Sequence, residues 1–65
     1  MHNYKFDDFD KLIEAKRSFD SNFDSKYSIV DVENLTISVE TENSLLYDTH
    51  IGAIMAMFGG RLVHS

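Results

Sequence analysis

The chain has 65 residues and a formal net charge of −5, with 43% hydrophobic residues and no cysteine or proline. A chain of this length builds one core, so we treat residues 1–65 as a single small acidic domain. The lack of cysteine excludes disulfides and the commonest zinc sites. The hydrophobic content is too high for a wholly disordered chain.

Helical periodicity predicts a first helix from about residue 8 to residue 21. At about 100° per residue, one face collects most of the apolar side chains: Phe6, Phe9, Leu12, Ile13, Phe19 and Phe23. Asp7 is the expected N-cap, with Asp10 close to the first-turn amides. Lys16 falls inside the apolar face, where its stem can lie along the core while its ammonium reaches water.

The next segment, residues 27–41, is rich in β-branched and aromatic residues and has no helical phase. We expect an antiparallel hairpin with a two-residue turn at Glu33-Asn34. The corresponding pairs are Val32 with Leu35, Val30 with Ile37 and Ser28 with Val39. This register separates an apolar face from a mostly polar one, and a one-residue slip would mix them. Because Glu-Asn is a weaker turn signal than Asn-Gly, a longer loop stays open.

A second helix is predicted from about residue 45 to residue 58. Asn43 or Ser44 is the expected N-cap, and Gly59-Gly60 supplies the stop signal. Residues 61–65 form either a short third strand or a loose tail. The predicted fold class is therefore α+β, a small α-β-β-α domain whose antiparallel hairpin packs against two helices on one face.

The second helix has no polar side chain from residue 51 to residue 58. A helix that is apolar on all sides must be covered on all sides. It is therefore either a central core helix or a surface completed by a second chain, with Gly52 and Ala56 allowing close approach. The candidate interface residues are Ile51, Ile54, Met55, Met57 and Phe58.

Residues 20–31 resemble an EF-hand calcium loop in outline. The candidate ligands are Asp20, Asn22, Asp24, Ser28 and Asp31 at positions one, three, five, nine and twelve. Ser25 stands where the motif needs glycine, Asp31 replaces the bidentate glutamate, and a predicted strand follows where the motif needs a helix. A helix end followed by Asx turns explains the same residues.

Nothing in the sequence points to catalysis or to a bound cofactor. His2, His50 and His64 have no metal-ligand spacing, and no nucleophile motif or phosphate-binding glycine loop is present. A domain of this size also rarely encloses a substrate pocket. We therefore expect a protein that is not an enzyme and that carries no cofactor.

The charge is distributed unevenly along the chain. Residues 1–26 carry five cations and six anions, whereas residues 27–60 carry five anions and no lysine or arginine. Hairpin carboxylates form the candidate acidic face: Asp31, Glu33, Glu40 and Glu42. Further carboxylates crowd the start of the first helix: Asp7, Asp8 and Asp10. Binding to a phosphate backbone needs the opposite charge, so we expect no direct contact with nucleic acid.

Three functional hypotheses follow. The favoured one is an acidic protein-binding module, a phage-type inhibitor that docks on a basic surface of a larger nucleic-acid-handling or defence enzyme. The second is a homo-oligomeric assembly component held by the helix at residues 51–58. The third is a small calcium-responsive domain.

The expected location is the cytoplasm. The N-terminal residues lack the apolar core of a signal peptide. The longest apolar run is eight residues, at 51–58, whereas a membrane span needs about 20. We therefore expect a soluble protein with no membrane contact.

Overall fold

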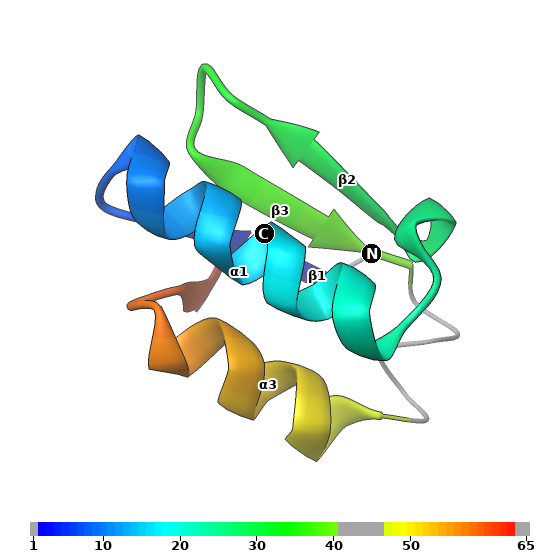
Figure 1. Ribbon diagram of the computed structural model, residues 1–65. Coiled ribbons are helices and arrows are strands. Elements are labelled where there is room, and N and C mark those ends of the chain that lie inside the picture. The colour runs from blue at the N-terminus through cyan, green and yellow to red at the C-terminus, as the bar shows by residue number, and fades with distance from the viewer. Residues whose placement is uncertain (1, 41–46, 64–65) are drawn as a thin grey trace.

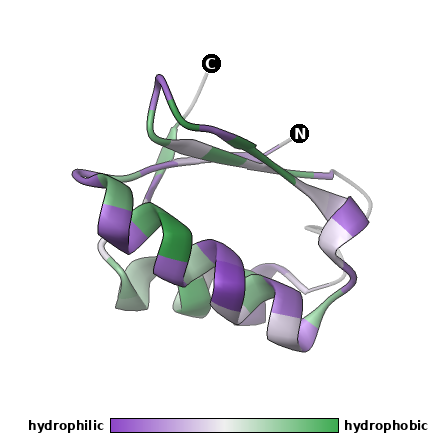
Figure 2. Ribbon diagram, turned by 45° about the horizontal axis from the view of Figure 1, so that its top comes forward, coloured by the Kyte–Doolittle hydropathy of each residue, from purple (hydrophilic) through white to green (hydrophobic). Residues whose placement is uncertain are grey.

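In the computed structural model, which describes residues 2–40 and 47–63, a four-stranded antiparallel sheet carries two helices on one face (Figure 1). The elements in chain order are β1 (His2–Lys5), α1 (Phe9–Asn22), the 3-10 turn η1 (Ser25–Tyr27), β2 (Ser28–Asp31), β3 (Thr36–Val39), α3 (Asp48–Met57) and β4 (Arg61–Val63). Figure 2 shows the sheet as one layer and the helices as the other. The predicted α+β class is confirmed.

Strand β1 is absent from the predicted order, yet it lies inside the sheet. The strand order is β2-β3-β1-β4, and each neighbouring pair is antiparallel. It follows that β1 runs parallel to β2, and β3 runs parallel to β4. Each helix therefore crosses between two parallel strands, which is the split β-α-β, or ferredoxin-like, arrangement. Because this arrangement supports many unrelated activities, it assigns no function by itself.

The sequence of β1 contains a period-two pattern that the helical prediction obscured. Tyr4 and Phe6 are buried beneath the helices, whereas Lys5 and Asp7 are exposed. Alternation of this kind is typical of a half-buried strand. Phe6 belongs to this pattern and precedes α1, so its assignment to the helical face was wrong.

The hairpin register is the one predicted from the sequence. Ser28 pairs with Val39, Val30 with Ile37, and Asp31 with Thr36. Strand β2 ends one residue before the predicted position and β3 begins one residue after it, so residues 32–35 form the connection. The amide of Leu35 donates to the carbonyl of Val32 at 3.3 Å, and Leu35 has a positive φ of 51°. A four-residue loop of this kind replaces the predicted tight turn.

Helix α1 begins one residue later than expected, and Asp8 rather than Asp7 is its N-cap. An Asp8 carboxylate oxygen accepts a hydrogen bond from the amide of Lys11 at 2.8 Å. The amide of Phe6 is bound to the carbonyl of Leu35 at 2.8 Å, which holds the preceding chain to the sheet. Since the helix cannot start until the chain leaves the sheet, the cap moves to Asp8.

The core lies between the two helices and the sheet. Its fully buried side chains come from the link between β1 and α1 and from α1, β3 and α3: Phe6, Leu12, Ala15, Phe19, Ile37, Val39, Ile51 and Met55. Phe9, which was predicted to face the core, is half-exposed, and Ala15 is buried in α1. Helix α3 ends at Met57, and of the two alternatives for the C-terminal residues the strand is present, as Arg61–Val63. The candidate caps Asn43 and Ser44 lie outside the described residues.

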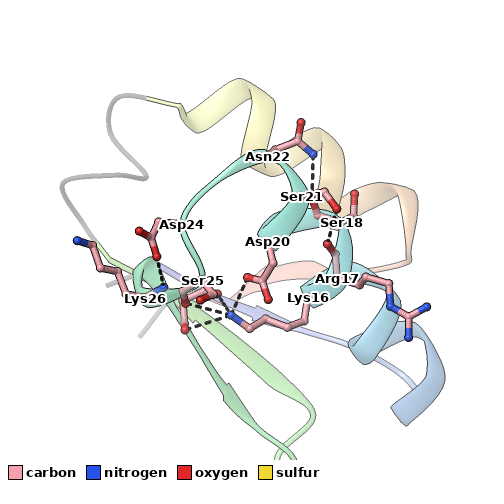
Figure 3. Close-up of polar contacts among 10 residues, drawn as sticks. Lys16, Arg17, Ser18, Asp20, Ser21, Asn22, Asp24, Ser25 and Lys26 are labelled. Carbon is pink, nitrogen blue, oxygen red and sulfur yellow. Dashed lines mark hydrogen bonds and ion pairs between the residues drawn. The ribbon is translucent and has the colours of Figure 1, made fainter.

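Lys16 joins α1 to η1 and β2 (Figure 3). Its ammonium donates to the Asp20 carboxylate at 2.9 Å, to the Ser28 hydroxyl at 2.6 Å and to the Ser25 carbonyl at 3.2 Å. The side chain is 20% exposed. The stem therefore lies against the core as predicted, and the partly exposed ammonium is held by protein oxygens.

Replacing Ser28 with alanine removes the shortest of these bonds and is expected to lower the free energy of unfolding by about 1–3 kcal/mol. Ser21→Ala is the matched control, since the exposed Ser21 hydroxyl donates, among the described residues, only to the Arg17 carbonyl of its own helix. It should change stability by no more than about 0.5 kcal/mol. Urea unfolding of both variants measures the difference, and equal stabilities would contradict a structural role for the Lys16 contacts.

Two glycines provide a second test of the packing. A Cβ at Gly60 would lie 2.6 Å from the Phe6 ring and 2.9 Å from the Met55 carbonyl oxygen, whereas nothing lies within 4 Å of a Cβ at Gly52. Gly60→Ala should therefore lower the unfolding free energy by about 1–3 kcal/mol through overpacking. Gly52→Ala should raise it by about 0.5–1 kcal/mol, because alanine favours the helix. Thermal melts of the two variants should shift in opposite directions, and a shared direction would refute this packing.

Candidate functional site

The structure does not gather the predicted hairpin carboxylates into one face. Asp31 and Glu33 lie at the turn, whereas Glu40 follows β3 at the other end of the hairpin, where its amide donates to the Tyr27 carbonyl at 2.9 Å. The two ends are separated by about 13 Å, the length of four strand residues. Glu42 lies outside the described residues.

The turn is instead joined to the other acidic segment of the chain. The hydrogen bond from the Phe6 amide to the Leu35 carbonyl places the link before α1 against the hairpin turn. The ammonium of Lys5 also donates to the Asn34 carbonyl at 3.0 Å. Five carboxylates therefore share one end of the molecule, which we term the acidic end: Asp7, Asp8, Asp10, Asp31 and Glu33.

The carboxylates of the acidic end are held to different degrees. Asp8 caps α1, and Asp7 pairs with Arg61 at 3.2 Å in an ion pair whose two side chains are each 67% exposed. Glu33 and Asp10 are exposed and form no ion pair with another described residue. Those two carboxylates remain available to a cationic partner, although the cations Lys5, Lys11 and Arg61 reduce the net negative charge around them.

Asp31 stabilises the turn. Its carboxylate accepts hydrogen bonds from the Asn34 side-chain amide at 2.7 Å and from the Asn34 backbone amide at 3.3 Å. These bonds, assisted by the charge of Lys5, lower the pKa of the Asp31 carboxyl below its usual value. The Asp31 side chain therefore links the two sides of the turn and remains exposed to solvent.

Helix α3 buries only one side in the folded domain, although its sequence is apolar throughout residues 51–58. Ile51, Ile54 and Met55 are buried in the core and Phe58 is half-buried, whereas Met57 is 73% exposed. Ala53 and Ala56 are exposed beside Met57, and we term these three residues the outer α3 face. Of the five candidate interface residues, only Met57 therefore offers a largely exposed side chain to a partner.

An aromatic cluster, not predicted from the sequence, joins the two helices where α1 ends and α3 begins. The ring of Phe23 lies 5.0 Å from that of Phe19, 5.1 Å from that of Tyr47 and 5.2 Å from that of His50, between centroids. Phe23 is half-buried against the core, so the cluster closes one end of the helical layer. The role of this contact is packing rather than chemistry.

The candidate calcium ligands are engaged separately (Figure 3). Asp20 lies in α1 and binds Lys16, the Asn22 side chain donates to the Ser18 carbonyl at 2.8 Å, and Asp24 accepts from the amide of Lys26 at 3.0 Å. Asp31 lies at the far end of β2. Within residues 2–40 and 47–63, no group of three or more histidine and acidic side chains is placed to hold a metal ion. This geometry gives the calcium hypothesis no support.

One surface emerges only because β1 is present. The face of the sheet opposite the helices, termed the open sheet face, carries side chains from all four strands: Asn3, Lys5, Ile29, Asp31, Thr36, Ser38, Arg61 and Val63. A shallow hollow on it is lined by polar residues and Val63, and there the Ser38 hydroxyl donates to the Asn3 side-chain oxygen at 2.6 Å. Among the described helices, none is long and apolar enough to cross a membrane.

The lowered pKa of Asp31 predicts a specific pH dependence of stability. Because the folded state favours the carboxylate, its stabilising effect is complete above the unfolded pKa and is lost as the pH falls through the folded pKa. The stability difference between the wild type and Asp31→Asn should therefore shrink on acidification. Urea unfolding across the acid range measures it, with Glu33→Gln as the control that keeps the bonds to Asn34. A difference that stays constant would contradict this role.

No protein-family model matches the chain, and no curated protein or solved structure matches it.

Proposed function

We propose that the protein is a small acidic protein-binding module that docks through the acidic end on a basic surface of a larger protein. The observation that carries the proposal is the hydrogen bond between Phe6 and Leu35, since it unites two acidic segments that are far apart in the sequence. Opposite charge steers two proteins together and sets their orientation. The net charge of −5 also attracts a positively charged partner at long range.

The acidic end is supported by rigid structure. Asp8 is held by the amide of Lys11, and Asp31 is held by Asn34. A partner that binds there does not have to order a loose loop, so less conformational entropy is lost on binding. Glu33 projects from this fixed turn without an ion-pair partner among the described residues.

A narrower form of the proposal names the partner class. A protein that handles nucleic acid has a basic groove for phosphates, and a compact acidic domain can occupy that groove as a phage-type inhibitor. The support for this form is the sign of the charge and the small size of the domain. The proposal involves binding rather than catalysis and retains the expected cytoplasmic location.

A homo-oligomeric assembly role is the second candidate, and the exposure of Met57 favours it. Met57 lies with Ala53 and Ala56 on the outer α3 face, which carries no charge. A flexible methionine among small residues suits an adaptable contact.

Two glutamates of the hairpin allow a matched test of the acidic end. Glu33 and Glu40 are both exposed, and neither forms an ion pair with a described residue, but they lie at opposite ends of the hairpin. Glu33→Lys should weaken partner binding at least about tenfold, and Glu40→Lys less than about threefold, although both change the net charge equally.

The partner is first captured from lysate of the source cells on the wild-type domain and then purified. Titration calorimetry of both variants against it, at low and at high salt, gives the affinities. Higher salt should weaken wild-type binding. Equal losses for the two variants, or an affinity that Glu33→Lys leaves unchanged, would refute the acidic end as the docking site.

A further inference from the structure

The open sheet face carries two ordered rows of side chains. Across the strand order β2-β3-β1-β4, the first row reads Ile29, Ser38, Asn3 and Val63, and the second reads Asp31, Thr36, Lys5 and Arg61. Residues directly opposite on neighbouring strands point to the same side of a sheet, so each row lies on one face. Both helices cover the other face (Figure 2).

The two rows are self-complementary. The first has an apolar side chain at each edge, Ile29 at 59% exposure and Val63 at 43%. The second has an acid at the β2 edge, Asp31, and a base at the β4 edge, Arg61. A two-fold axis parallel to the strands would place β2 over β4 of a second copy and β3 over its β1. Ile29 would then meet Val63, and Asp31 would meet Arg61, twice in each dimer.

We propose that the open sheet face binds a second copy of this chain, face to face, in a weak two-fold symmetric dimer. Two sheets packed in this way lie about 10 Å apart. The middle of the contact holds the small polar side chains Ser38, Asn3 and Thr36 and also Lys5, whose ammonium donates to the Asn34 carbonyl at 3.0 Å. They leave the apolar edges and the charge pairs as the groups that set the orientation.

The charges at the two edges are exposed and can take up these contacts. Asp31 and Arg61 lie three strand spacings apart, about 14 Å, which is too far for them to pair within one chain. The Arg61–Asp7 pair is largely exposed, and such surface pairs contribute little stability, so Arg61 can exchange partners. Asp31 remains exposed and has lone pairs beyond those used by Asn34.

This arrangement favours a second copy over an unrelated protein, because one face supplies both halves of each contact. An unrelated partner needs no acid and base placed symmetrically about the sheet centre. The dimer shares Asp31 with the acidic end and takes Arg61 from its pair with Asp7. Glu33 and Asp10 lie outside both rows, so Glu33→Lys tests the acidic end separately.

The test is the concentration dependence of the protein alone. Sedimentation equilibrium should reveal reversible dimers with a Kd no weaker than about 1 mM. Amide NMR shifts of β2 and β4 should move with concentration, while those of the outer α3 face stay constant. Ile29→Asp should raise the Kd at least about tenfold by placing a charge against Val63 of the second copy.

Met57→Asp distinguishes this dimer from an oligomer held by the outer α3 face, because it places the same charge on an exposed apolar residue of α3. It should leave the Kd unchanged. Arg61→Asp should weaken the dimer, and adding Asp31→Arg should restore at least part of the affinity, which a merely structural effect would not do. A strict monomer at about 1 mM would overturn the proposal, as would association lost in Met57→Asp but kept in Ile29→Asp.

Discussion

Strand β1 pairs with β3 on one side and with β4 on the other, and the remaining features of the molecule depend on this position. Tyr4 and Phe6 enter the core from β1 and its link to α1. Asn3 and Lys5 lie on the opposite side and complete the rows of the open sheet face. The chain that leaves β1 carries Asp7 and Asp8 to the hairpin turn. One short strand thus contributes to the core and to both candidate surfaces.

Two polar contacts keep the helices in position over this sheet. Lys16 binds the Ser28 hydroxyl at the start of β2, and the amide of Gly60 donates to the Met55 carbonyl at 2.8 Å where α3 leads into β4. The first contact joins α1 to the hairpin, and the second ends α3 just before β4, where Gly60 packs against the Phe6 ring. Such contacts matter because a domain of this size buries only about 60% of its unfolded surface and is marginally stable.

The two proposed surfaces differ in what they recognise. The acidic end presents one sign of charge and suits a basic partner, whereas the open sheet face carries both signs and suits a second copy. Glu33 and Asp10 belong to the first surface alone, and Ile29 and Val63 belong to the second alone. A dimer through the sheet would present two acidic ends and would increase the avidity for a repetitive basic surface.

Local pattern in the sequence determined much of this protein. The helical period and the hairpin alternation predicted two helices, the two hairpin strands and their register, because these depend on residues near one another in the chain. The α+β class followed from them. Gly59-Gly60 likewise predicted the end of α3, since a positive φ, here 81° at Gly59, favours glycine.

Tertiary structure alone decided where the surfaces lie. The four residues of β1 include only one large apolar side chain, Tyr4, so their sequence does not predict a central strand. Strand β1 forms because residues 36–39 and 61–63 pair with it on its two sides. The acidic end depends on the same long-range pairing, and the outer α3 face depends on which side of an apolar helix meets the core. Sequence patterns record local periodicity and composition, whereas these surfaces arise from contacts between distant segments.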